Sequence, residues 1–214
     1  MHLSLSRSLL VLACAALPIS AHAIDIQRWH TADGTQVLLV ARHDNPIVDV
    51  QISFKGAGAA FNPPGKGEVA DFTAAILTDG TRTLDEEAFN ARANDLAADI
   101  GSSSSDEGAS IRLRSLSRAE VLHPALKLVN QSLTEPRFDA EVFRRRQNQS
   151  VTALQQNETD PAFVADRAAT LLDYPDHPYG SSARTNAQSL RAVTLADIRA
   201  FHRSRYGKNN AIVA

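Results

Sequence analysis

The order in which strand-like and helix-like segments follow one another constrains this fold more than any single motif. Strand-like segments are rich in β-branched or alternating apolar residues, and they cover 24–42, 46–58, 101–117 and 209–214. Helical segments carry apolar residues at helical spacing, and they cover 67–78, 83–101, 117–136, 139–172 and 193–207. This order predicts an α+β fold, in which helices lie against a largely antiparallel sheet. It does not match the strict strand–helix alternation of a parallel α/β fold.

Short signals at the ends of these segments indicate where the elements begin and end. The sequence "ADGT" at 32–35 divides the first segment into a hairpin. Thr83 with Glu86, and Ser117 with Glu120, match the capping-box pattern and predict two helix starts. The sequence "ETDP" at 158–161 predicts a break within the long helical segment.

The N-terminus has the pattern of a secretory signal peptide. Arg7 supplies a basic residue, "SLLVLACAALPIS" forms an apolar core, and "AHA" at 21–23 fits a small-x-small cleavage site. We therefore expect residues 1–23 to be a signal peptide and residues 24–214 to form the mature chain in the periplasm or outside the cell. A lipoprotein signal ending at Cys14 is the alternative, but it would leave a very short apolar core. No later segment is expected to anchor the chain in a membrane.

Composition excludes several classes of function. The net charge of −2 argues against a nucleic-acid-binding protein. Cys14 is the sole cysteine, so cleavage after residue 23 leaves none, and disulfides and thiolate metal sites are excluded. The five histidines beyond residue 23 lie far apart in sequence, so no helix presents an imidazole pair, and no G-x-S-x-G nucleophile motif occurs. We expect no cofactor and no bound metal.

Three segments, taken in order, resemble the pitrilysin/insulinase family of zinc peptidases, which includes the mitochondrial processing peptidase. Residues 26–67 resemble the family's opening strands and the proline-containing loop after them. The sequence "VADFTAAILTDGT" at 69–81, with the helix and strand that follow, is similar to the segment that builds the zinc site. The sequences "YPDHPYG" and "SLRAVTLADIRAFHRSRYGKNNAIVA" resemble the segments that close the first domain. The resemblance implies the fold of that first domain, incomplete here at its C-terminal end.

The zinc motif itself is degenerate. Active members carry H-x-x-E-H on this helix, where two histidines hold zinc and the glutamate acts as general base. The resemblance puts Asp71 and Ala75 at the histidine positions, Ala74 at the glutamate and Ala153 near the third ligand. Since a catalytic zinc site needs three protein ligands, one carboxylate cannot form it. An aspartate near a helix start also has an ordinary role, because it favours the helix dipole.

The resemblance thus implies a non-catalytic subunit, or a truncated remnant of one, rather than an enzyme. In this family, inactive halves pair with a catalytic member that carries the intact zinc motif. The inactive half supplies chamber wall and contacts to the shared peptide substrate. Two alternatives remain open at this point. The chain could be an active zinc metalloendopeptidase, or a stand-alone binding or scaffold module of the cell envelope.

Overall fold

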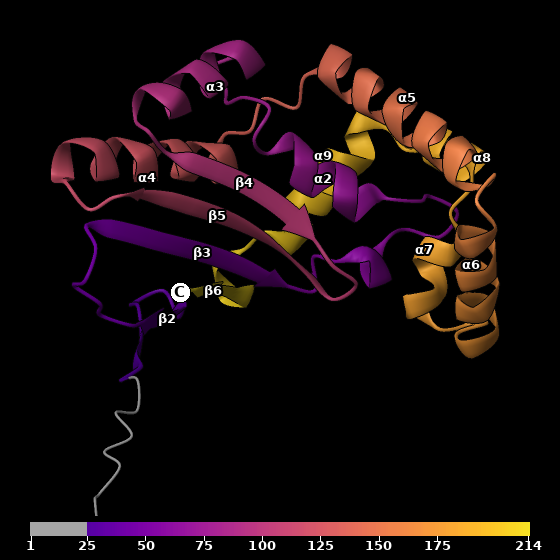
Figure 1. The fold of residues 1–214 in the computed structure, drawn as a ribbon, viewed down its shortest axis with the longest axis horizontal. Helices are drawn as coiled ribbons and strands as arrows, with labels where there is room; N and C mark the ends of the chain where they lie inside the picture. The colour runs from indigo at the N-terminus through magenta and orange to yellow at the C-terminus, as the bar shows by residue number, and fades with distance from the viewer. Residues whose placement is uncertain (1–24) are drawn as a thin grey trace, which may run out of the picture.

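One six-stranded sheet organises residues 25–214, the part of the chain that the computed structural model describes (Figure 1). The expected signal peptide lies outside these residues. The strands, in sheet order, are β1 (Gln27–His30), β2 (Gln36–Leu39), β6 (Ala211–Val213), β3 (Ile47–Lys55), β5 (Gly108–Leu116) and β4 (Asp99–Ser104). Neighbouring strands pair antiparallel, except that β2 and β6 are parallel. The predicted α+β class with a largely antiparallel sheet is confirmed.

The strand expected near residue 209 does not lie at an edge of the sheet. β6 pairs with β2 on one side and with β3 on the other, and Ile212 lies between Gln36 and Ser53. The backbone of Ala214 continues this pairing, because its N–H and C=O both bond to Gln51. The last residues of the sequence therefore fill the middle of the sheet.

The helices are α2 (Val69–Ile76), α3 (Glu86–Asp95), α4 (Ala119–Thr134), α5 (Ala140–Asn157), α6 (Pro161–Asp173), α7 (Ser181–Arg184), α8 (Ala187–Arg191) and α9 (Leu195–Arg205). Within residues 25–214 there are also three short 3-10 turns, η1 (Ala59–Phe61), η2 (Pro178–Gly180) and η3 (Lys208–Asn210). Each predicted helical segment contains a helix, but the segment predicted over 83–101 is helical only to Asp95, because its last residues belong to β4, and α7 and α8 lie outside the predicted segments. The predicted break at 158–161 is confirmed, since α5 ends at Asn157 and α6 begins at Pro161.

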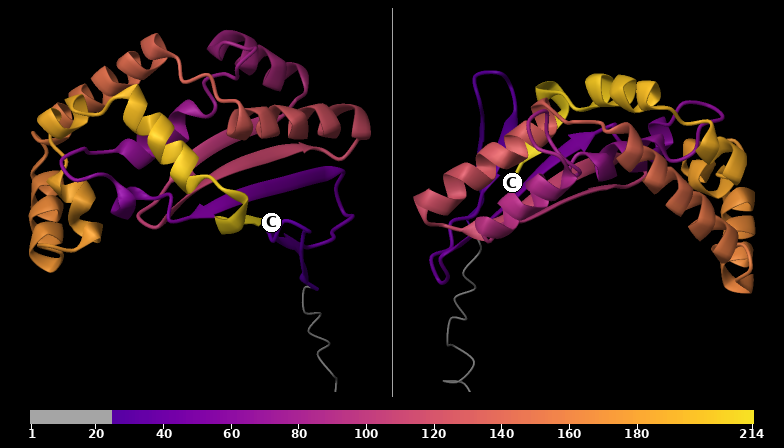
Figure 2. Two further views of the ribbon diagram at one scale, coloured as in Figure 1. Left: turned by 180° about the vertical axis from the view of Figure 1, so that it is seen from behind. Right: turned by 90° about the horizontal axis from the view of Figure 1, so that it is seen from above.

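The helices lie on one face of the sheet. Phe54, Ile111 and Leu113 point to this face and are buried under the helices. Arg112 and Arg114 alternate with them and point to the other face, where Arg114 is ion-paired with Asp49 (2.7 Å). An antiparallel sheet that is apolar on one face and charged on the other packs its apolar face on the core and exposes the charged face to solvent. The sheet and the helices therefore form two layers. Figure 2 shows the helices on one side and α6 with α7 at the end remote from the β1–β2 hairpin.

The predicted capping box at Thr83 is wrong. The chain forms a turn at Thr81–Leu84, in which the Leu84 N–H donates to Thr81. The helix therefore begins at Glu86, and Asp85 caps it by accepting from the Ala88 N–H (2.9 Å). Tertiary contacts hold this turn, because the Arg82 N–H donates to the Glu135 carbonyl (2.7 Å) and Thr81 pairs with Pro136. The helix start therefore lies past the predicted motif.

The predicted capping box at Ser117 is also wrong. The Ser117 N–H donates to the Pro46 carbonyl (2.9 Å), which holds Ser117 beside the sheet, one residue past the end of β5. The helix α4 begins at Ala119 after Arg118, whose side chain makes no capping hydrogen bond. The backbone bond between Ser117 and Pro46 thus forms in place of the predicted capping box.

Candidate functional site

The helix α2 carries the motif positions, and the loop before it fixes its start. Gly67 is buried so tightly that a Cβ there would lie 2.8 Å from the Thr185 side chain. Glu68 then adopts a left-handed backbone conformation (φ 61°), which is costly for a residue with a Cβ. Asn62 completes the start, because its side-chain oxygen accepts from the Ala70 N–H (2.8 Å). The prolines and glycines of "FNPPGKG" thus form an ordered support for α2.

Burial along α2 is more extensive than one apolar stripe. The helix lies between the sheet, α5 and α9, so that several of its sides are covered. The fully buried residues on it include Phe72, Thr73, Ala74 and Ile76. Ala75 is half-buried, and Asp71 is exposed. Small residues at 74 and 75 therefore fit a helix that neighbours approach closely.

Two serines of the edge strand β4 reach the motif positions. The Ser102 hydroxyl donates to the Ala74 carbonyl oxygen (2.6 Å), and the Ser104 hydroxyl donates to the Asp71 carboxylate. The hydroxyl groups of both serines are therefore hydrogen-bonded to residues of α2. Asp71 is thus held by a neighbouring hydroxyl.

The structure brings Asp71, Ala74 and Ala75 onto one helix, whereas Ala153 lies apart from them. Ala153 is exposed on α5, next to polar residues such as Gln149. One carboxylate and three methyl groups do not fit the three-ligand set of a catalytic zinc ion. Within residues 25–214, no group of three or more His, Cys, Asp or Glu side chains is placed to hold a metal.

Glu68 is an acidic residue that the sequence did not single out. Its carboxyl is largely buried, and it faces Asp71 and Ser150 of α5. Burial, and then the negative charge of Asp71, raise the pKa of Glu68, whereas the hydrogen bond with Ser150 lowers it. Proximity of Glu68 to Asp71 follows from their positions in one helical turn, but the burial comes from the packing of α5.

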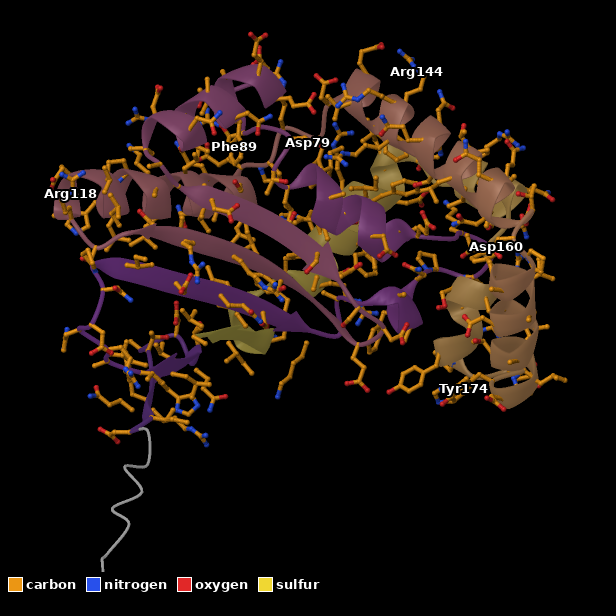
Figure 3. All side chains as sticks on the ribbon, viewed as in Figure 1. Asp79, Phe89, Arg118, Arg144, Asp160 and Tyr174 are labelled. Atoms are coloured by element: carbon orange, nitrogen blue, oxygen red, sulfur yellow. The ribbon has the colours of Figure 1, made fainter. Side chains whose placement is uncertain are left out.

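The end of α2 is held by an ion pair that sequence reasoning also missed. Asp79 is 5% exposed, and Arg146 of α5 binds it through two nitrogens, with Nη2 2.5 Å from Oδ1. Gly80 follows with φ +126°, and a Cβ there would lie 2.7 Å from the Leu84 carbonyl oxygen. Figure 3 shows Asp79 between α2 and the start of α5. The "DGT" sequence therefore follows the end of α2 and also makes a tertiary contact, the ion pair of Asp79 with Arg146.

A buried tyrosine hydroxyl lies in the same core. Tyr206 packs on Phe54 (ring centroids 4.8 Å) and on His202 (5.1 Å). Its hydroxyl is inaccessible to solvent and has no hydrogen-bond partner among the described residues. Burial, and then the charge of Asp71, raise the pKa of this hydroxyl. No local sequence pattern predicts this buried hydroxyl, because Phe54 and Asp71 come from segments far from Tyr206 in the sequence.

The remaining histidines do not converge on the motif helix. His177 accepts the Tyr179 N–H through Nδ1 (3.2 Å), and the His202 ring bonds to the Leu133 carbonyl (3.0 Å). His123 is exposed on α4. Burial lowers the pKa of His202, which favours the neutral ring. The rings of His177 and His202 thus have local structural roles.

Comparisons with known proteins agree with this picture. The structure matches the crystal structure of a peptidase M16 inactive domain from Pseudomonas fluorescens, with a TM-score of 0.85 and 31% identity. It also matches a protease from Helicobacter pylori, with a TM-score of 0.78 and 18% identity, a likeness that concerns the fold alone. Each match covers 89% of this chain and 46% of the other.

The name of a curated relative also describes a protein that is not a peptidase. The "Non-peptidase homolog YmxG" of Helicobacter pylori is 23% identical over 163 residues, which are 76% of this chain and 37% of that protein. No family model matches the sequence. The chain spans less than half the length of these relatives. The chain therefore has the fold of the M16 peptidase domains that it matches, and two of the proteins that it resembles are described as an inactive domain and as a non-peptidase homologue.

Proposed function

We propose that this chain is part of a non-catalytic subunit of an envelope peptidase. It forms chamber wall and contacts the peptide substrate, while a partner with an intact zinc motif hydrolyses the peptide. The observation that carries this proposal is α2, which is largely buried yet presents one carboxylate, Asp71, at the positions that the resemblance assigns to the zinc motif. A helix kept in place without its ligands supports a role in shape and contact rather than chemistry.

The periplasm or the outside of the cell is part of the proposal. It rests on the signal-peptide pattern of residues 1–23. In the described residues, no helix is both long and apolar enough to cross a membrane. Fusion of residues 1–30 to alkaline phosphatase, which is active only after export, would test this part. An inactive fusion in cells that export a control protein would contradict it.

Co-purification tests the proposed partnership. The full-length protein, tagged at its C-terminus, is purified from its own host, and bound proteins are identified by mass spectrometry. We expect a protein that carries H-x-x-E-H at roughly equal amount, together with peptidase activity that a chelator abolishes. Purification without any such protein would favour the alternative of a stand-alone envelope scaffold.

Metal content separates the proposal from the alternative of an active zinc endopeptidase. The isolated chain is expected to hold no stoichiometric zinc, because Asp71 offers one bond where three protein ligands are needed. Metal analysis of chain purified without chelator checks this. About one zinc per chain, lost in the Asp71→Ala variant, would overturn the non-catalytic assignment of the motif.

A further inference from the structure

Three aromatic rings gather in the "YPDHPYG" loop between α6 and α7. The centroid of the His177 ring lies 4.6 Å from that of Tyr179 and 5.8 Å from that of Tyr174. The centroids of the two tyrosine rings lie 5.8 Å apart. Tyr174 and His177 are exposed and Tyr179 is half-buried, and Figure 3 shows Tyr174 at the end of α6. The rings therefore form a cluster at the surface of the domain.

Backbone contacts hold this loop in one shape. Arg184 donates to the carbonyl oxygens of Tyr174 (3.2 Å) and His177 (2.9 Å). Gly180 packs so closely that a Cβ there would lie 2.4 Å from the Tyr174 carbonyl oxygen. The His177 Nδ1 atom accepts the Tyr179 N–H (3.2 Å), which ties one ring to the backbone of the next. A ligand therefore meets rings that are already ordered, which lowers the entropic cost of binding.

Two carboxylates of the β4–β5 turn lie beside the rings. The Tyr179 hydroxyl donates to Glu107, and Asp106 is near enough for its charge to act on the same hydroxyl. The turn η1 joins the two segments, because it accepts from the Ser181 hydroxyl (3.1 Å) and donates to the Asp106 carbonyl (2.9 Å). Within residues 25–214, neither carboxylate is ion-paired.

Exposed rings beside unpaired carboxylates fit a planar cation. The face of an aromatic ring attracts cations, and a guanidinium can stack on that face while its N–H groups pair with a carboxylate. An ammonium group is a compact charge and does not combine the two contacts in the same way. Arg184 does not fill this role, because it is bound to the loop carbonyls.

We propose that Tyr174, Tyr179 and Glu107 bind a guanidinium group, carried by an arginine side chain of another polypeptide. The Tyr174 ring, which is 40% exposed, provides the stacking face, and Glu107 provides the paired carboxylate. Asp106 adds negative charge beside it. The inference goes beyond the proposed function, since the site uses none of the motif positions and holds whether or not a partner carries zinc.

NMR of the tyrosine rings tests this site, because the chain has three tyrosines and the third, Tyr206, is an internal control in the core. The full-length protein is labelled with ¹³C in its tyrosine rings, and single Tyr→Phe variants assign the signals. The probe is N-acetyl-arginine methylamide, and its uncharged control is the citrulline analogue. We expect saturable shifts of the Tyr174 and Tyr179 signals with the arginine probe alone, and no shift of Tyr206.

Three outcomes of this titration would overturn the proposal. They are the absence of saturable shifts, an equal response to the citrulline probe, and shifts that include Tyr206 to the same extent. Free arginine is titrated as a further arm and is expected to bind no more tightly than the blocked probe. Tighter binding of free arginine would assign the site to the amino acid instead of a polypeptide.

Substitutions then test both parts of the contact. Glu107→Gln removes the charge and keeps the shape, and Tyr174→Leu removes the ring, so each is expected to weaken binding of the arginine probe about fivefold. Glu87→Gln, at an exposed glutamate of α3 without an ion pair, is the matched control and is expected to leave binding unchanged. Circular dichroism confirms that each variant is folded. Equal binding by all variants, or an equal loss in Glu87→Gln, would refute the site.

Discussion

Arg146 of α5 holds the nearly buried carboxylate of Asp79, so that the end of α2 is tied to a helix that begins more than sixty residues later. The bond uses the Nε and Nη2 atoms of the guanidinium, a geometry that fixes both position and orientation. Adjacent Arg145 binds Glu86 at the start of α3 in the same region. Consecutive arginines of α5 thus connect it to both neighbouring helices, α2 and α3.

Arg146→Ala is expected to destabilise the domain by about 2–3 kcal/mol, because Asp79 is left charged and unpaired in a buried position. Arg144→Ala is the matched control from the same helix turn, since the Arg144–Glu141 pair is more than half exposed on both sides. The control is expected to change the unfolding free energy by at most about 0.5 kcal/mol. Urea unfolding of the wild-type protein and of the two variants measures both changes in unfolding free energy. Equal losses would mean that the Asp79 contact contributes no more than a surface pair.

Replacing Ala74 or Ala75 singly by the residue of the zinc motif is expected to destabilise the domain, and by different amounts. Ala74 is 1% exposed, so Ala74→Glu places a carboxylate in a packed core and is expected to cost about 2 kcal/mol or more. Ala75 is half-buried, and Ala75→His is expected to cost less, about 1 kcal/mol. Thermal unfolding would show the order. A larger loss for Ala75→His would mean that α2 is rotated relative to this packing.

Glu68 is expected to make the domain less stable as pH rises. Its pKa is raised in the folded state, so the folded state binds more protons than the unfolded state above pH 4.5, the ordinary value for glutamate. Stability from this group is therefore full at low pH and is lost as the pH rises through and above 4.5. Glu68→Gln should raise the melting temperature at pH 7, with the difference vanishing below about pH 4. A difference that is constant across pH would indicate a cause other than ionisation.

Tyr206→Phe is expected to leave stability unchanged or to raise it by about 1 kcal/mol. The hydroxyl is buried without a partner, so its removal relieves an unsatisfied polar group while the ring keeps its packing on Phe54. Tyr179→Phe is the control, because the Tyr179 hydroxyl donates to Glu107 at the surface. Denaturant midpoints compare the two. A loss above about 1 kcal/mol in Tyr206→Phe would show that the hydroxyl has a stabilising partner.

The amino-acid sequence by itself determined the class of fold and the degenerate motif. Alternating apolar residues predicted strands within 101–117, and prolines and glycines separated the elements, because these are local properties of the backbone and of one strand. Ala74 and Ala75 stand where the family resemblance places the zinc motif, and their identity is read from the sequence. Chemical identity at a motif position needs no tertiary information.

Tertiary structure decided what depends on distant partners. The Asp79–Arg146 pair, the burial of Tyr206, and the position of β6 inside the sheet join segments far apart in sequence, and no local pattern encodes them. The two predicted capping boxes are wrong for the same reason. The bond from the Arg82 N–H to the Glu135 carbonyl holds the turn before α3, and the bond from the Ser117 N–H to the Pro46 carbonyl holds the chain before α4. The folded chain also shows that α6 has no fully buried residue and leaves Val164 and Leu172 exposed. An apolar stripe in a sequence predicts burial, and only the folded chain shows which stripe the domain leaves uncovered.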